Sequence, residues 1–241
     1  MLADFEPTAT HSGSLGSHVH LPDTSLQRLL DFLTNEVISW RDDPVRPSRT
    51  SETALTDSLC DHLSSAARMS HGWDIFHFRT EVEDETHKGR KIDLAPKPCG
   101  VSVLIAGQEY TPYQMLLPIE CKRLPTPRGK DRDEREYVIT RSATTGGIQR
   151  FKAGYHGAAH RIGAMIAYVQ DGDAAQWHRH VKKWIQELIN SRQPGWTNED
   201  YLQIVRNNKA KGLCVAESTH SRDGDLPEIA LRHIWIEMKS L

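Results

Sequence analysis

The residues with the clearest capacity for chemistry lie in a short apolar stretch, Leu116–Leu124. The stretch is typical of a buried strand, yet it carries an acid, Glu120, and an amine, Lys122. Side chains alternate between the two faces of a strand, so these two share one face and Cys121 points to the other. Because unpaired buried charge is costly, the pair needs a reason. We expect either a simple ion pair at a strand end or a metal-binding carboxylate beside a lysine that acts on a nucleophile.

Two further acids occupy positions that suggest a role beyond folding. Asp93 lies in the middle of a predicted short strand, 91–96, where aspartate is depleted. Glu52 lies in the first turn of a predicted helix, 51–70, on the side that faces inward. The helix dipole favours an acid in that turn, which is the alternative explanation for Glu52. Taken with the strand pair above, the set is suited to metal-assisted hydrolysis of a phosphodiester.

These residues supply the groups that such hydrolysis needs. Asp93 and Glu120 would hold Mg²⁺, with Mn²⁺ as a substitute, through hard oxygen ligands that include the backbone carbonyl of Cys121. The metal lowers the pKa of a bound water and neutralises charge that grows on the phosphate. Lys122 would orient the attacking water or help to deprotonate it. Glu52 would complete the metal shell directly or through water.

Ile92-Asp93, followed by Ile119-Glu120-Cys121-Lys122 and preceded by Glu52, resembles the PD-(D/E)xK nuclease superfamily. Ile92 stands where that superfamily often has proline. The resemblance covers about residues 51–170 and implies the restriction-endonuclease-like fold. This is an α/β domain with an αβββαβ core and a mixed central sheet flanked by helices, here with an extra N-terminal helix and C-terminal strands. The implied activity is that of a Mg²⁺-dependent endonuclease, a phosphodiesterase, with DNA favoured over RNA as the substrate.

A second resemblance concerns the chain after the core strand. Segments 135–138, 150–155 and 163–169 are similar to nuclease subunits of prokaryotic anti-phage defence systems. This resemblance implies a cytoplasmic effector of a defence complex. No recognition module or motor is recognisable outside the core, so we expect an ATPase or sensor partner, or activation in a homo-oligomer. The Gln-xxx-Tyr pattern of RecB-like members is not met, since Tyr155 comes six positions after Gln149.

Basic and polar residues near the predicted site are candidates for contacts with nucleic-acid phosphates. They lie at the end of the Lys122 strand, in a hydrophilic loop over 125–136, and in a predicted helix over 137–155 interrupted near Gly146-Gly147. The candidates are Arg123, Arg128, Lys130, Gln149, Arg150 and Lys152. Such a charge run is usually only solvated, and its place beside the site is what suggests phosphate binding. The competing hypothesis is a non-catalytic nucleic-acid-binding or assembly subunit that keeps the fold.

Composition indicates one ordinary globular domain. The chain has 241 residues, of which 38% are hydrophobic and 26% charged, and its net charge of −2 gives no overall basic field. Residues 1–22, with His11, His18 and His20, are predicted as a flexible tail, and 23–241 as a single domain. Four scattered cysteines indicate neither a disulfide framework nor a zinc knuckle. No secretory signal or membrane span is visible.

Periodicity predicts the remaining elements. We expect helices over 23–40 and 174–190, and strands over 74–82, 101–105, 161–170, 213–218 and 229–238. The strand at 161–170 is apolar on both faces and therefore belongs inside a sheet. His156 and His160 have the i,i+4 spacing of a zinc pair, but without a third ligand they are predicted as surface or packing residues. His220 and His233 are predicted as structural.

Overall fold

The computed structural model describes residues 24–129, 132–141 and 145–238, so the predicted tail over 1–22 lies outside the described residues. The elements follow in the order α1 (Thr24–Asp42), α2 (Glu52–Met69), β1 (Phe76–Glu83), β2 (Lys91–Pro98), β3 (Val103–Ile105), β4 (Gln108–Tyr110), β5 (Ile119–Leu124), α3 (Gly147–Lys152), β6 (Ile162–Val169), α4 (Ala174–Asn190), η1 (Asn198–Asp200), β7 (Gln203–Asn208), η2 (Lys209–Lys211), β8 (Leu213–His220) and β9 (Ile229–Glu237).

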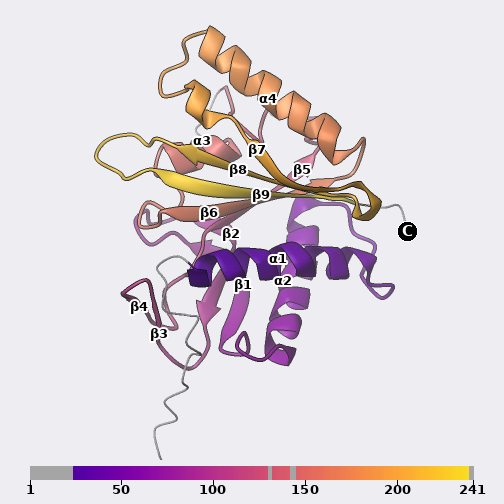
Figure 1. Cartoon of the computed structure of the whole chain (residues 1–241), viewed down its shortest axis with the longest axis vertical. Helices are drawn as coiled ribbons and strands as arrows, with labels where there is room; N and C mark the ends of the chain where they lie inside the picture. The colour runs from indigo at the N-terminus through magenta and orange to yellow at the C-terminus, as the bar shows by residue number, and fades with distance from the viewer. Residues whose placement is uncertain (1–23, 130–131, 142–144, 239–241) are drawn as a thin grey trace, which may run out of the picture.

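A seven-stranded mixed sheet runs through the protein in the order β1-β2-β5-β6-β9-β8-β7 (Figure 1). The strands β5, β6 and β9 run parallel to one another, and every other neighbouring pair in the sheet is antiparallel. The strand predicted over 101–105 is shorter and lies outside this sheet, where it pairs with β4. The predicted α/β class, with a mixed central sheet flanked by helices, is confirmed.

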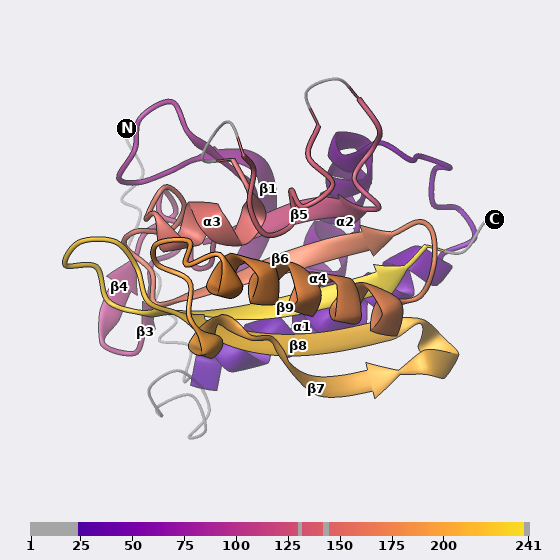
Figure 2. The same cartoon turned by 90° about the horizontal axis from the view of Figure 1, so that it is seen from above.

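Helices cover both faces of the sheet, with α1 and α2 on one side and α3 and α4 on the other (Figures 1 and 2). The central strand β6 connects the two hydrophobic layers through the alternation of its side chains. Ile166 and Tyr168 pack with the residues of α1 and α2, whereas Met165 and Ala167 pack with those of α4. β6 is thus buried on both faces, as its sequence predicts.

Helical spacing places α1, α2 and α4 correctly. In α1, Leu30, Leu33 and Val37 are buried and form one apolar face. In α4, the side chain of Asp173 caps the first turn by accepting the backbone N–H of Gln176 at 2.7 Å. Within the described residues, no helix is both long and apolar enough to cross a membrane.

The helix predicted over 137–155 is wrong in its first half, because only Gly147–Lys152 is helical. The chain over 136–138 instead runs beside the start of α3, where its carbonyls accept the free N–H groups of the first helical turn. Gly147 N–H donates to Glu136 at 2.8 Å, and the next two N–H groups donate to the next two carbonyls at 3.2 and 3.0 Å. This close approach requires glycine, since a Cβ on Gly147 would lie 2.9 Å from the Tyr137 carbonyl oxygen.

Candidate active site

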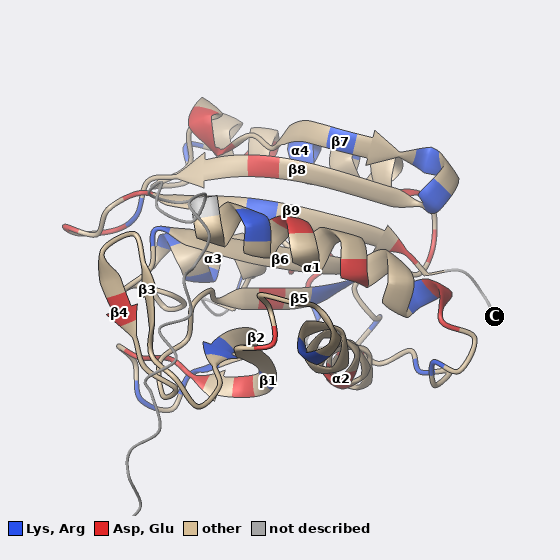
Figure 3. Ribbon diagram, turned by 60° about the horizontal axis from the view of Figure 1, so that its bottom comes forward, with Lys and Arg blue, Asp and Glu red and all other residues tan. Residues whose placement is uncertain are grey.

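The candidate site lies where β2 and β5 separate. These neighbouring strands share a single register pair, Leu94 with Ile119. Beyond that pair, the carboxylate of Asp93 replaces the backbone partner that β5 lacks, and its Oδ2 accepts the Cys121 N–H at 2.8 Å. The mid-strand aspartate therefore has a structural cause, because a short acceptor is needed where the ladder opens. The strand β5 carries charged side chains beside this opening, whereas its neighbour β6 carries none (Figure 3).

The amine of Lys122 lies at the centre of the predicted acids. Its Nζ is 2.8 Å from Glu120 Oε1, 3.4 Å from Glu52 Oε1 and 3.9 Å from Asp93 Oδ2. The amine also donates a hydrogen bond to the Cys121 carbonyl at 3.1 Å. The Lys122 side chain is only 6% exposed. The structure thus brings together all four residues that the sequence singled out, and from three different elements.

Glu52 reaches the strand from the start of α2. Ser51 caps this helix by accepting the Ala54 N–H, which fixes Glu52 as the first helical residue. Its Oε2 accepts the backbone N–H of Arg123 at 3.0 Å, and its Oε1 faces Lys122. A carboxylate whose only role was its favourable interaction with the helix dipole would not need contacts with Arg123 and Lys122. Glu52 therefore belongs to the site as well as to the helix terminus.

Glu120 is fully buried and is held by basic groups from α3 and the turn after it. Arg150 Nη1 donates to Glu120 Oε1 at 2.7 Å, and His156 Nδ1 lies 3.0 Å from Oε2. The sequence left His156 and His160 as surface or packing residues, but both are buried beside acids. His160 lies 3.5 Å from Glu85 rather than near Glu120, so the two histidines do not form a zinc pair.

His156 joins the site through a turn that spacing does not predict. The Tyr155 and His156 N–H groups both donate to the Arg150 carbonyl, at 2.8 and 3.2 Å, which folds the chain back at the end of α3. Gly154, with a φ of 66°, makes this turn. The sequence feature that could have indicated this turn is Gly154, which lies between a basic residue and His156.

Burial and neighbouring charges together set the pKa values of these groups. Burial raises the pKa of Asp93 to about 7, and the charge on Glu120 adds to the rise. Burial alone would lower the pKa of Lys122, but the surrounding carboxylates, led by Glu120, raise it above its usual value. Burial alone would raise the pKa of Glu120, but Lys122, His156 and Arg150 hold it well below its usual range. Lys122 and Glu120 therefore form a charged pair.

The phosphate-contact candidates fall into different environments. Arg128 is exposed and Arg123 is partly exposed, whereas Lys130 lies outside the described residues. Gln149 accepts backbone N–H groups through its Oε1 and so caps its own helix, α3. Lys152 is buried, and its amine lies 2.5 Å from Asp200, so this side chain is not at a surface where a nucleic acid would lie.

A second polar cluster has the connectivity of a hydrolase triad but is enclosed. Ser218 Oγ lies 2.7 Å from His220 Nε2, and His220 Nδ1 lies 2.6 Å from Asp200 Oδ1. His233 Nε2 is a further partner of the Ser218 hydroxyl, at 2.8 Å. All four residues are buried. The burial of this cluster is consistent with the structural role predicted for His220 and His233.

The donor set around Lys122 fits a hard divalent cation in its chemistry. It offers three carboxylates and the Cys121 carbonyl, which are the oxygen ligands that Mg²⁺ and Mn²⁺ take. Glu120 Oε2 is buried, and among the described residues His156 Nδ1, at 3.0 Å, is its polar neighbour. As these residues stand, however, no group of three or more His, Cys, Asp or Glu residues in the described ranges could hold a metal ion. The Lys122 amine lies among the carboxylates instead.

Comparison with known proteins adds nothing to this geometry. No family model, no curated protein and no solved structure matches the chain. The residues around the opening between β2 and β5, and the elements that hold them, are therefore the basis for a functional assignment.

Proposed function

We propose that this protein is a metal-dependent nuclease that hydrolyses phosphodiester bonds, with DNA as the favoured substrate. The observation that carries the proposal is the convergence of Glu52, Asp93 and Glu120 on the amine of Lys122. Three acids and one lysine, gathered at the opening of a sheet, are more than an ion pair needs. They are the groups with which proteins bind a divalent cation and act on a phosphate.

The order and direction of the elements support the same proposal. The sequence α2, β1, β2, β5, α3, β6 has the αβββαβ order of the restriction-endonuclease-like core, with the β3–β4 hairpin inserted before β5. β1, β2 and β5 are antiparallel neighbours, and β6 joins β5 in parallel. In this arrangement the acid of β2 lies close to the acid and lysine of β5, which supports the proposal of a PD-(D/E)xK site.

In the proposed site, Asp93, Glu120, Glu52 and the Cys121 carbonyl would hold Mg²⁺ or Mn²⁺. The bound metal would lower the pKa of a water and neutralise charge on the phosphate. Lys122 is surrounded by acids and keeps its charge, so it acts as a hydrogen-bond donor and not as a base. It orients the attacking water and stabilises negative charge on the phosphoryl oxygens.

Other residues of the chain hold these groups in place. Arg150 and His156 contact the two oxygens of Glu120, and the Arg123 N–H fixes Glu52. Water attacks the phosphorus, one P–O ester bond breaks, and the departing oxygen takes a proton. The products are a phosphomonoester and an alcohol.

The proposal extends to the setting in which the nuclease works. We propose that it serves as the effector of an anti-phage defence complex and that an ATPase, a sensor or a second copy of the chain activates it. The enclosed state of Lys122 and Glu120 supports this, because a site with its charges already paired needs a rearrangement before it can cleave a substrate.

A substrate panel tests the proposed function. Purified protein is incubated with supercoiled plasmid, linear duplex, single-stranded DNA and RNA, in Mg²⁺, in Mn²⁺ or in EDTA. We expect cleavage of DNA that requires the metal, is lost in Asp93→Asn and persists in Lys183→Met, a variant of an exposed lysine on α4. Cleavage in EDTA or by Asp93→Asn would contradict the proposal. Nucleic-acid binding without cleavage under every condition would favour the non-catalytic alternative.

A further inference from the structure

Lys122 is the shared counter-ion of the site. Asp93 and Glu52 are each about one quarter to one third exposed, at 29% and 27% of their side chains, and each lies within 4 Å of the amine. Among the described residues, no other basic side chain forms an ion pair with either of them. Glu120 is different, because it also has Arg150 and His156 beside it. Removal of the lysine would therefore leave the two more exposed acids without an ion-pair partner among the described residues.

The amine also blocks the position to which the oxygen donors point. Its neighbours are one oxygen from each of the three carboxylates and the carbonyl of Cys121. These are the same oxygen atoms, or the same side chains, that a divalent cation would need as ligands. Two cations cannot share one set of ligands at close range without strong repulsion, which burial increases. Metal binding and the present position of Lys122 thus exclude each other.

We propose that the ammonium of Lys122 occupies the metal position as an internal place-holder, so that the lysine lowers the affinity of the site for divalent cations. The inference depends on the proposed function, since it assumes that these carboxylates are the metal site. It adds a form of regulation to that site. The metal enters only when the amine leaves the carboxylates, and a phosphate group of the substrate is an anion to which the amine can move. The nuclease is then protected against loading metal in the absence of substrate.

The direction of the predicted effect separates this proposal from a purely catalytic lysine. A lysine that contacts only water or phosphate, and lies away from the carboxylates, leaves metal affinity nearly unchanged when it is replaced. A lysine that only supports the fold weakens metal binding when it is replaced, because the ligands lose their positions. A place-holder does the opposite, since its removal leaves Asp93 and Glu52 uncompensated and available to the metal.

The test is a binding measurement and needs no turnover. Mn²⁺ binding is measured by calorimetry, without nucleic acid, for the natural protein, Lys122→Met and Lys183→Met, and thermal unfolding checks that each is folded. We expect Lys122→Met to bind Mn²⁺ about tenfold more tightly or better, a moderate coupling between two sites, with Lys183→Met unchanged. Lys122→Gln retains a donor for Glu120 and takes the place of the methionine variant if that variant does not fold.

The outcomes distinguish the two proposals. If the natural protein binds Mn²⁺ and the Lys122 variants bind it equally or more weakly, the place-holder is refuted and the metal site stands. If neither the natural protein nor a folded Lys122 variant binds Mn²⁺, the carboxylates are not a metal site, and both the place-holder and the proposed function fail. Tighter binding in the variant together with a larger rise in its melting temperature on addition of Mn²⁺ supports both.

Discussion

Replacement of Lys152 by methionine should destabilise the protein strongly, although the sequence suggested a phosphate contact for this residue. The Lys152 and Asp200 side chains are 8% and 2% exposed, and their charged atoms are 2.5 Å apart. Removal of one partner of a buried ion pair costs about 3–5 kcal/mol, because the other charge stays buried. His220 remains beside Asp200, at 2.6 Å, so we expect a value near the lower end, about 3 kcal/mol.

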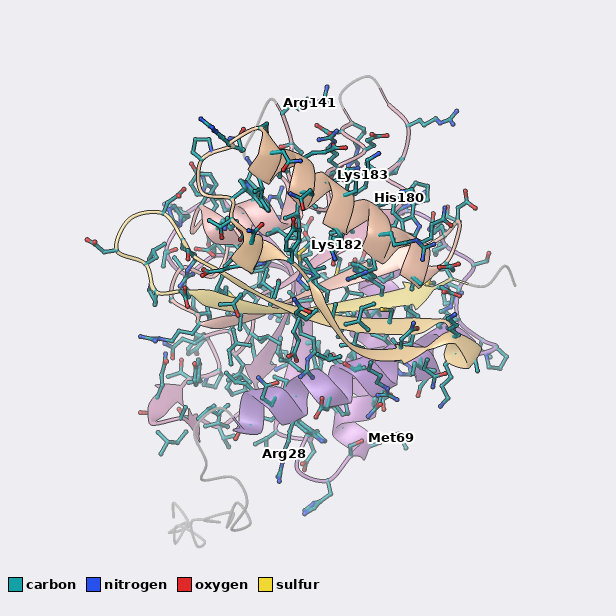
Figure 4. All side chains as sticks on the ribbon, turned by 45° about the horizontal axis from the view of Figure 1, so that its top comes forward. Arg28, Met69, Arg141, His180, Lys182 and Lys183 are labelled. Carbon is teal, nitrogen blue, oxygen red and sulfur yellow. The ribbon has the colours of Figure 1, made fainter. Side chains whose placement is uncertain are left out.

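The assay for this variant is urea and thermal unfolding of the whole chain. For a protein of this size, about 3 kcal/mol corresponds to a fall in melting temperature of about 6–12 °C. Lys183→Met is the matched control, because this lysine is 75% exposed and points away from α4 (Figure 4), and it should change stability by less than about 0.5 kcal/mol. If the two variants have the same stability, the buried pair does not support the fold, and Lys152 becomes available again as a nucleic-acid contact.

Two further predictions concern the packing of α3 and the buried histidines. Gly147→Ala should lower the free energy of unfolding by about 1–3 kcal/mol, because its Cβ would lie 2.4 Å from Met165 Cε and 2.9 Å from a backbone oxygen. Gly129→Ala, with its closest contact at 3.3 Å, is the control. Equal stability of the two variants would refute the close packing at Gly147. Burial holds the pKa of His233 well below 6.5, so the folded state binds fewer protons than the unfolded chain. Stability should therefore be complete above about pH 6.5 and fall below it, by about 1.4 kcal/mol at pH 5.5 from this residue alone. Urea unfolding at pH 7.5 and 5.5 measures the difference, and a fall of the same size in a folded His233→Gln variant would contradict this origin.

The sequence was informative wherever alternation or helical spacing extended over a whole element. β6 is apolar on both faces, and only an interior strand can bury such a segment, so its place in the sheet was predictable. The same kind of reasoning placed Glu120 and Lys122 on one face of β5 and Glu52 at the start of a helix. Glu52, Glu120 and Lys122 are charged residues in positions that suggest a role beyond folding, and they were enough to indicate where a site would form.

The parts that the sequence did not predict depend on tertiary contacts. β7 was missed because Ile204 and Val205 are both exposed and the strand has no buried face to produce alternation. The residues at 137–138 were predicted as helix, whereas in the fold they and Glu136 supply carbonyls to the first turn of α3. His156 could not be assigned because the turn that brings it to Glu120 depends on a single glycine.

Sequence also does not distinguish a buried cation from an exposed one. Arg150 and Lys152 are two residues apart on the same short helix, and both were candidates for phosphate contacts. In the structure, Arg150 is partly exposed and holds the acid of the candidate site, whereas Lys152 is buried against Asp200. Burial depends on the whole fold, so a local pattern of charges does not predict it.

The most direct test of the central claim is DNA cleavage by folded Lys122→Met in Mg²⁺ or Mn²⁺, measured beside the natural protein and Lys183→Met. If the four converging residues are the site of phosphodiester hydrolysis, the natural protein and the control variant cleave at similar rates. Lys122→Met then loses cleavage by at least about a hundredfold, as expected when a group that stabilises transition-state charge is removed. Cleavage by folded Lys122→Met at the natural rate would contradict the account.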